Sequence, residues 1–137
     1  MTPDTLEGGC FCGAVRYRVT GDPKWSAHCH CESCRRAAGG PVVTYAGYET
    51  GRFAFTAGEP KVYAKVPGTE RHFCGTCGST LTFRSGRWPG EIHILLATLD
   101  DPEAVTPECH VHVDEQLGWI HMDDGLPTYT TVGSDSE

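Results

Sequence analysis

Cys10-Phe11-Cys12 near the start of the chain and Cys74-Gly75-Thr76-Cys77 near its middle decide the fold that we expect. Cysteines spaced this closely, with glycine beside them to permit a tight turn, direct both sulfurs toward one point. A structural zinc ion takes four protein ligands, so neither pair completes a site alone. We predict that the two pairs share one zinc, which would tie the first strand to the later sheet of a small domain. The alternative is that Cys10 and Cys12 are ordinary buried cysteines.

Cys29-His30-Cys31-Glu32-Ser33-Cys34 supplies three more sulfurs within six residues. Three thiolates leave one zinc position open, as catalytic sites do. Such a soft, anionic site favours binding a substrate thiol as thiolate over making hydroxide. Two alternatives remain open: one of these cysteines belongs to the four-ligand site, or His28, His30 or Cys109 is a fourth ligand. Cys109 otherwise reads as a buried, inert thiol, and a nucleophilic role of the methionine-R-sulfoxide reductase kind is disfavoured by the residues that follow it.

Length and charge bound the function. The 137 residues predict one domain, 1–137, and the formal charge is −7. Seven zinc-bound thiolates would bring the charge to about −10, which disfavours a phosphate backbone, so we expect no nucleic-acid partner. No apolar run is long enough for a membrane span and no signal peptide is evident, so we expect no membrane association. Eight cysteines also permit disulfides, but without an export signal we favour reduced thiolates and a cytoplasmic location.

The rest of the chain predicts a mostly β fold with short strands between glycine and proline turns. Glu32–Ala38 is the one segment that we expect to be helical, ending at Gly39-Gly40. The apolar run 92–97 predicts a central strand, and residues 128–137 predict a frayed tail. The remaining expected strands are 14–19, 41–45, 53–55, 61–66, 70–73, 81–84 and 109–113.

Three ordered motifs carry a family resemblance. The segments Gly8–Tyr17, Cys29–Arg35 and Phe73–Ser79 resemble the glutathione-dependent formaldehyde-activating enzymes, a family that includes centromere protein V, and Pro107–Leu126 resembles the family's ending. The resemblance implies a mostly β, tent-like zinc fold related to Mss4, with two zinc ions per chain. It implies a carbon–sulfur lyase type of reaction, in which a thiol such as glutathione adds to a small aldehyde and gives S-hydroxymethylglutathione.

The resemblance also implies which residues hold each metal. Its structural zinc would be held by Cys10, Cys12, Cys74 and Cys77, and its catalytic zinc by Cys29, Cys31 and Cys34. This division agrees with the count of four and three reached from the spacing.

Other residues are weaker candidates for the reaction. We predict that Arg35 donates to the developing alkoxide or anchors a substrate carboxylate, and that Glu32 moves a proton. The alternatives are a solvated helix residue for Arg35 and a favourable first-turn acid for Glu32. His30 is expected to point away from the metal. A further expectation is that His110 and His112 share one strand face at the surface, with lining of the pocket or adventitious metal binding as the alternatives. Three aromatic residues could wall a pocket or simply pack in the core: Trp88, Trp119 and Tyr129. A non-catalytic two-zinc protein-binding module is the alternative function.

Overall fold

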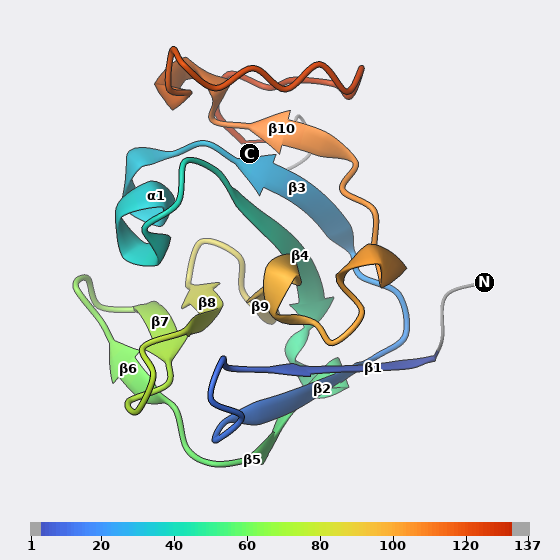
Figure 1. Cartoon of the computed structure of the whole chain (residues 1–137), viewed down its shortest axis with the longest axis vertical. Helices are drawn as coiled ribbons and strands as arrows, with labels where there is room; N and C mark the ends of the chain where they lie inside the picture. Colours follow the sequence, from blue (N-terminus) through green and yellow to red (C-terminus); the bar gives the residue numbers. More distant parts are fainter. Residues whose placement is uncertain (1–3, 133–137) are drawn as a thin grey trace.

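Two β-sheets form the framework of the protein, which is described over residues 4–132 of a computed structural model (Figure 1). The smaller sheet has the strand order β1-β2-β5 and is antiparallel. The larger sheet has the order β10-β3-β4-β9-β8-β7-β6, and β10 runs parallel to β3 while the other neighbours are antiparallel. The elements are β1 (Thr5–Gly9), β2 (Arg16–Thr20), β3 (Trp25–Cys29), α1 (Glu32–Ala38), β4 (Val43–Glu49), β5 (Phe53–Ala57), β6 (Lys61–Tyr63), β7 (Thr69–Phe73), β8 (Thr80–Ser85), β9 (Glu91–Leu95) and β10 (Cys109–Val111).

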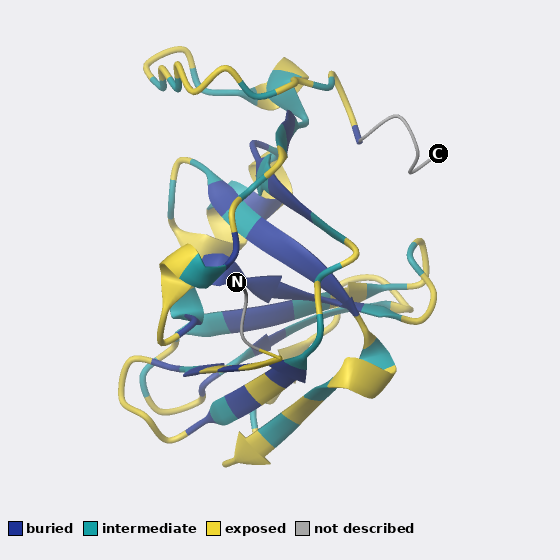
Figure 2. Cartoon of the chain, turned by 90° about the vertical axis from the view of Figure 1, so that its right-hand side faces the viewer, coloured by how far each residue is buried: buried dark blue, intermediate teal, exposed yellow. Residues whose placement is uncertain are grey.

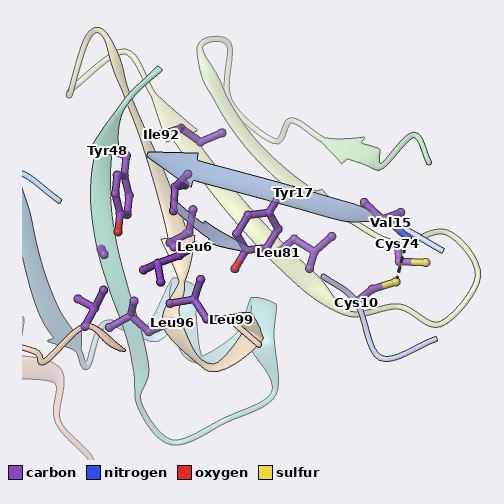
Figure 3. Close-up of a cluster of buried hydrophobic side chains, with 14 residues drawn as sticks. Leu6, Cys10, Val15, Tyr17, Tyr48, Cys74, Leu81, Ile92, Leu96 and Leu99 are labelled. Atoms are coloured by element: carbon purple, nitrogen blue, oxygen red, sulfur yellow. Dashed lines mark hydrogen bonds between the residues drawn. The ribbon is translucent and has the colours of Figure 1, made fainter. Parts of the chain in front are cut away.

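Alternation along the central strands separates two apolar clusters. On β4, Ala46 and Tyr48 face the cluster shared with the small sheet, while Tyr45 faces the other cluster, beside α1. Successive side chains on a strand point to opposite faces, so one strand serves both clusters. Figure 3 shows the first cluster, with Tyr17 and Leu81 at its centre and two cysteines, Cys10 and Cys74, at one end. The mostly β fold class is confirmed, and β9 lies between β4 and β8, as expected of a central strand.

The short helix has the predicted bounds. Cys31 caps its start, because its sulfur accepts a hydrogen bond from the backbone amide of Cys34. Gly39 ends it with a φ of 70°, a left-handed conformation that glycine adopts without steric cost. The helix therefore fixes two of the three clustered cysteines, while Cys29 ends the preceding strand β3.

The C-terminal segment differs in part from the prediction of a frayed tail over 128–137. His110 of β10 exchanges backbone hydrogen bonds with Pro127 and Tyr129, and Thr128 forms a bridge with His110. These bonds hold residues 127–131 along β10 (Figure 1), although most side chains after β10 are exposed or half-buried (Figure 2). Residues 133–137 lie outside the described residues.

Three predicted strands end early. The strand expected over 61–66 is β6 and stops at Tyr63, and the one expected over 92–97 stops at Leu95, where a 3₁₀ turn follows. The strand expected over 109–113 stops at Val111 because His112 adopts a left-handed conformation, with a φ of 58°. Within residues 4–132, no helix is long and apolar enough to cross a membrane.

Candidate metal centres and the adjoining pocket

Two tight turns bring four cysteines together. One turn follows β1 and the other joins β7 to β8, and glycines with positive φ, Gly13 and Gly78, let each chain reverse. The sulfur atoms of four cysteines all lie within 4.8 Å of one another: Cys10, Cys12, Cys74 and Cys77. The Cys10–Cys12 and Cys12–Cys74 sulfur distances are 3.6 and 3.8 Å. Zinc–sulfur bonds of about 2.3 Å place the sulfurs of a tetrahedral site about 3.8 Å apart, so this cluster fits zinc.

The backbone around this cluster favours thiolates. The Val15 amide lies 3.2 Å from the Cys10 sulfur, and the amides of Thr76 and Cys77 lie 3.3 and 3.4 Å from the Cys74 sulfur. Hydrogen bonds from Ser79 lower the pKa of Cys77 to about 5. N–H donors directed at sulfur stabilise negative charge, as metal binding requires.

The second cluster joins a strand end to a helix start. The sulfurs of Cys29, Cys31 and Cys34 lie within 4.8 Å of one another, and those of Cys29 and Cys34 are 3.7 Å apart. This spacing also fits zinc–thiolate ligation. Within residues 4–132, no fourth cysteine, histidine or carboxylate belongs to this group. The ring of His30 instead hydrogen-bonds to His110, with 2.9 Å between Nε2 and Nδ1.

A cavity of about 310 Å³ opens directly onto the three cysteines. Its walls include the aromatic residues Trp25, Tyr45, Phe83 and Trp88. The small residue Gly47 makes room for one wall, since a Cβ there would lie 2.3 Å from Nε1 of the Trp25 indole. One side of the cluster therefore faces a pocket that has aromatic side chains among its walls.

Two polar side chains face the cluster from the larger sheet. Arg71 on β7 lies 3.4 Å from the hydroxyl of Tyr45 on β4 and 4.0 Å from the Cys34 sulfur. Its guanidinium also lies 4.7 Å from the centroid of the Phe83 ring, a cation–π distance that holds it over the pocket wall. A donor pair thus stands beside the sulfurs.

The cluster shares its negative charge unequally. Hydrogen bonds from Cys29 and Cys31 lower the pKa of Cys34 to about 2, and Tyr45 and Arg71 act in the same direction against burial. Hydrogen bonds with Cys31 and Cys34, together with burial, raise the pKa of Cys29. The contacts of Cys34 therefore favour its thiolate form. Burial, and then the charge of Cys34, raise the pKa of Tyr45, which keeps its hydroxyl a hydrogen-bond donor.

A half-buried acid, Glu91, holds two of the side chains that line the pocket. Glu91 accepts hydrogen bonds from the Trp25 indole and His93, both at 3.0 Å, and pairs with Lys24 at 2.8 Å. Burial raises the pKa of Glu91, but hydrogen bonds from Lys24, Trp25 and His93 outweigh it, so the net shift is downward. These contacts fix the Trp25 and His93 side chains that line the cavity.

The predicted catalytic residues of the helix do not line this pocket. Arg35 donates hydrogen bonds to the carbonyls of His30 and Glu115, and Glu32 pairs with Arg36 at 2.9 Å. Glu32 and Arg35 border a different, shallower hollow. Their role in the reaction stays a prediction.

The histidines and aromatic residues that the sequence singled out lie in different parts of the structure. The expectation that His110 and His112 share a face is wrong, because the strand ends between them. His112 lines the pocket, whereas His110 lies in register with His28. Trp88 lines the pocket, as one of the two expectations stated. Trp119 is exposed and lies beside the outer hollow, which is the one that Glu32 and Arg35 border.

Arg71 and Tyr45 were not identified from the sequence. Arg71 is 37 residues from Cys34, and only the strand order from β7 through β8 and β9 to β4 brings it close. Both residues lie in strands that the sequence predicts. Alternation of side chains along each strand is the one sequence signal that could have placed the two residues on the same face of the sheet.

Comparisons with known proteins identify a family and a fold for this chain. Residues 5–115 match the model of the family described as glutathione-dependent formaldehyde-activating enzyme. A Halomonas elongata protein named "Putative glutathione-dependent formaldehyde-activating enzyme" is 32% identical over 127 residues, covering 86% of this chain and 81% of that protein. An uncharacterized lyase of Schizosaccharomyces pombe is 31% identical over 113 residues, covering 80% of each. A crystal structure of a Rhodobacter sphaeroides protein, 22% identical, shares the fold with a TM-score of 0.62 over 90% of this chain and 99% of that one.

Proposed function

The chain belongs to the glutathione-dependent formaldehyde-activating enzyme family, and we propose that it adds a thiol such as glutathione to a small aldehyde such as formaldehyde. The reaction is of the carbon–sulfur lyase type, and two zinc ions per chain would take part in the protein's structure and chemistry. The observation that carries the proposal is a three-cysteine cluster that opens onto a pocket holding a donor pair.

One cysteine cluster would have a structural role and the other a catalytic role. Cys10, Cys12, Cys74 and Cys77 would hold a structural zinc that ties the turns of the two sheets together. Cys29, Cys31 and Cys34 would hold the second zinc, which supplies an electrophilic position that keeps a thiol ionised near neutral pH. The seven thiolates need a reducing compartment, so we propose a cytoplasmic location.

Tyr45 and Arg71 would act on the aldehyde. The thiolate sulfur attacks the carbonyl carbon, a carbon–sulfur bond forms, and the carbonyl electron pair moves to oxygen. The Tyr45 hydroxyl donates a hydrogen bond to that developing alkoxide. The alkoxide then takes a proton from water, which balances the proton that the thiol released on ionising, and gives the hydroxymethyl thioether. Arg71 contacts the Tyr45 hydroxyl and contributes positive charge beside it, so it both orients the donor and stabilises the new negative charge.

The surrounding surface suits an anionic peptide thiol. A groove of about 690 Å³ adjoins the pocket and shares Ser33, Thr69 and Arg71 with it. Arg36 and Lys65 also line this groove, so it is cationic on a protein of formal charge −7. A thiol held at the cysteines could extend its carboxylates along the groove, where these cations would bind them.

Cobalt substitution tests thiol binding directly. Glutathione added to the cobalt-loaded protein should change the visible absorption of the metal, because a fourth sulfur enters an open three-sulfur site. An unchanged spectrum at millimolar glutathione would contradict the proposal and favour the alternative, a non-catalytic two-zinc module.

Turnover is tested by NMR with carbon-13 formaldehyde. Tyr45→Phe should lower the rate of hydroxymethyl thioether formation about 100-fold, the usual effect of losing one donor to an oxyanion. Arg71→Ala should also lower the rate, because it removes the positive charge beside the Tyr45 hydroxyl. Arg84→Ala is its matched control, because Arg84 is exposed and follows Phe83 on the opposite face of β8. A large loss in Arg35→Ala with none in Tyr45→Phe would return the donor role to the helix.

A further inference from the structure

A third group of metal-ligating side chains lies on the face of β3 opposite the cysteine triplet. We propose that His28, His110 and Asp124 form a third cation site, which takes zinc and clamps the C-terminal segment to the larger sheet. One ligand atom from each residue lies within 4.8 Å of the others. This site is independent of the proposed enzymatic reaction.

The strand register creates the histidine pair. His28 on β3 and His110 on β10 are directly paired in a parallel ladder, so their side chains project from the same face. Their rings are stacked, with centroids 4.8 Å apart and planes inclined by 27°. Asp124 approaches from the C-terminal segment, and its two oxygens lie 2.8 and 3.0 Å from Nε2 of His110. The three ligand atoms therefore lie close enough together to be directed at one ion.

Each ligand already has an outer partner that orients it. Nδ1 of His28 lies 2.8 Å from the Thr44 hydroxyl, which leaves Nε2 as its ligand atom. Nδ1 of His110 lies 2.9 Å from Nε2 of His30. The Leu126 amide donates to Oδ1 of Asp124 at 3.1 Å. Zinc-binding histidines regularly use their second nitrogen in this way, and such partners fix the ring for the metal.

The proton balance closes between His110 and His30. Before binding, Nε2–H of His110 donates to Asp124, and Nε2–H of His30 donates to Nδ1 of His110. After binding, Nε2 of His110 holds the ion and its hydrogen resides on Nδ1, which donates to Nε2 of His30. The His30 hydrogen then resides on Nδ1, the buried nitrogen that has no hydrogen-bond partner in the described structure. The neutral pair therefore releases no proton.

The charge of the three ligands and their access to solvent favour a divalent cation between hard and soft, such as zinc. Two neutral imidazoles and one carboxylate give the group a charge of −1 on an acidic protein. His110 is 4% exposed in its side chain and Asp124 is 33% exposed, so an ion can enter past the carboxylate. Two nitrogens and one carboxylate oxygen suit zinc, and the two thiolate clusters are softer sites that would load first.

Calorimetry on protein already holding two zinc ions tests the site. Zinc titrated into this protein should bind with one further equivalent. Asp124→Ala and His28→Ala should weaken that binding at least tenfold while native mass spectrometry still counts two tightly held ions. The matched controls Asp123→Ala and His121→Ala change neighbouring exposed residues and should leave it intact.

Several outcomes would overturn the proposal. No third equivalent in the wild type would reject the site. Loss of the third equivalent in His112→Ala, with retention in Asp124→Ala, would assign it to the group of His112, Asp114 and Glu115. If His28→Ala fails to fold, Asp124→Asn decides alone, since it removes the charge of an exposed ligand; undiminished binding there would also reject the site.

Discussion

Cys77→Ser and Cys31→Ser should destabilise the protein by different amounts, although each removes one half-buried sulfur from a metal cluster. Cys12 and Cys74, joined through the first cluster, are 62 residues apart, whereas Cys29 and Cys34 of the second are 5 apart. Treating each metal as a cross-link that restricts the unfolded chain gives about 4 kcal/mol for the long connection and about 2 kcal/mol for the short one. Serine at position 31 can still cap α1, so the cap adds little to the second value.

Guanidinium unfolding of the zinc-loaded variants under reducing conditions measures this difference. Native mass spectrometry should count one zinc fewer in each variant, and Cys77→Ser should lose about 2 kcal/mol more stability than Cys31→Ser. Since total stabilities are about 5–15 kcal/mol, Cys77→Ser should also show lower soluble yield. Equal losses would refute the view that the four-cysteine cluster ties the two sheets and the triplet does not.

Further predictions concern the core and its pH dependence. Tyr17→Phe should cost about 1 kcal/mol in thermal unfolding because it removes the 2.7 Å bond to Thr98, whereas Tyr48→Phe should be neutral or stabilising because that buried hydroxyl has no partner among the described residues. Leu81→Ala should cost about 2–5 kcal/mol in chemical unfolding, since Leu81 is 0% exposed; a loss below 1 kcal/mol would contradict its central place in the core. The pKa of Glu91 is lowered from 4.5 in the folded state, so its contribution is present above pH 4.5 and disappears as pH falls through the folded pKa. Glu91→Gln should therefore lose about 1 kcal/mol at pH 7, and the gap to wild type should close in acid; a gap that widens below pH 4 would be inconsistent with this sign.

Local signals predicted local structure well. The bounds of α1 follow from the residues Glu32–Ala38 and the glycine after them, and the structure reproduces them. The division of seven cysteines into a group of four and a group of three was predicted from their spacing, because two cysteines this close in sequence can direct their sulfurs to one point only if the chain turns between them. Strand β3 was missed since Trp25–Cys29 has no clean alternation: buried Ser26 and Ala27 are adjacent, and the strand packs on both faces.

Features that depend on strand order could not be predicted. Arg71 reaches Cys34 only because β7 and β4 belong to one continuous sheet, in which β8 and β9 lie between them. The sequence prediction of Arg35 relied on proximity along the chain, yet a helix turns successive side chains to different sides, and Arg35 faces the outer hollow. The histidine pair of β3 and β10 likewise depends on a parallel register between distant segments.

The parallel pairing of β10 with β3 also sets an order for biosynthesis. Cys29 and its register partner Val111 are about eighty residues apart, which a ribosome adding about 5–20 residues per second needs about 4–16 s to make. Until then one edge of β3 is open, and open edges recruit other strands. The triplet needs only six consecutive residues, so a nascent chain can capture its metal during this interval.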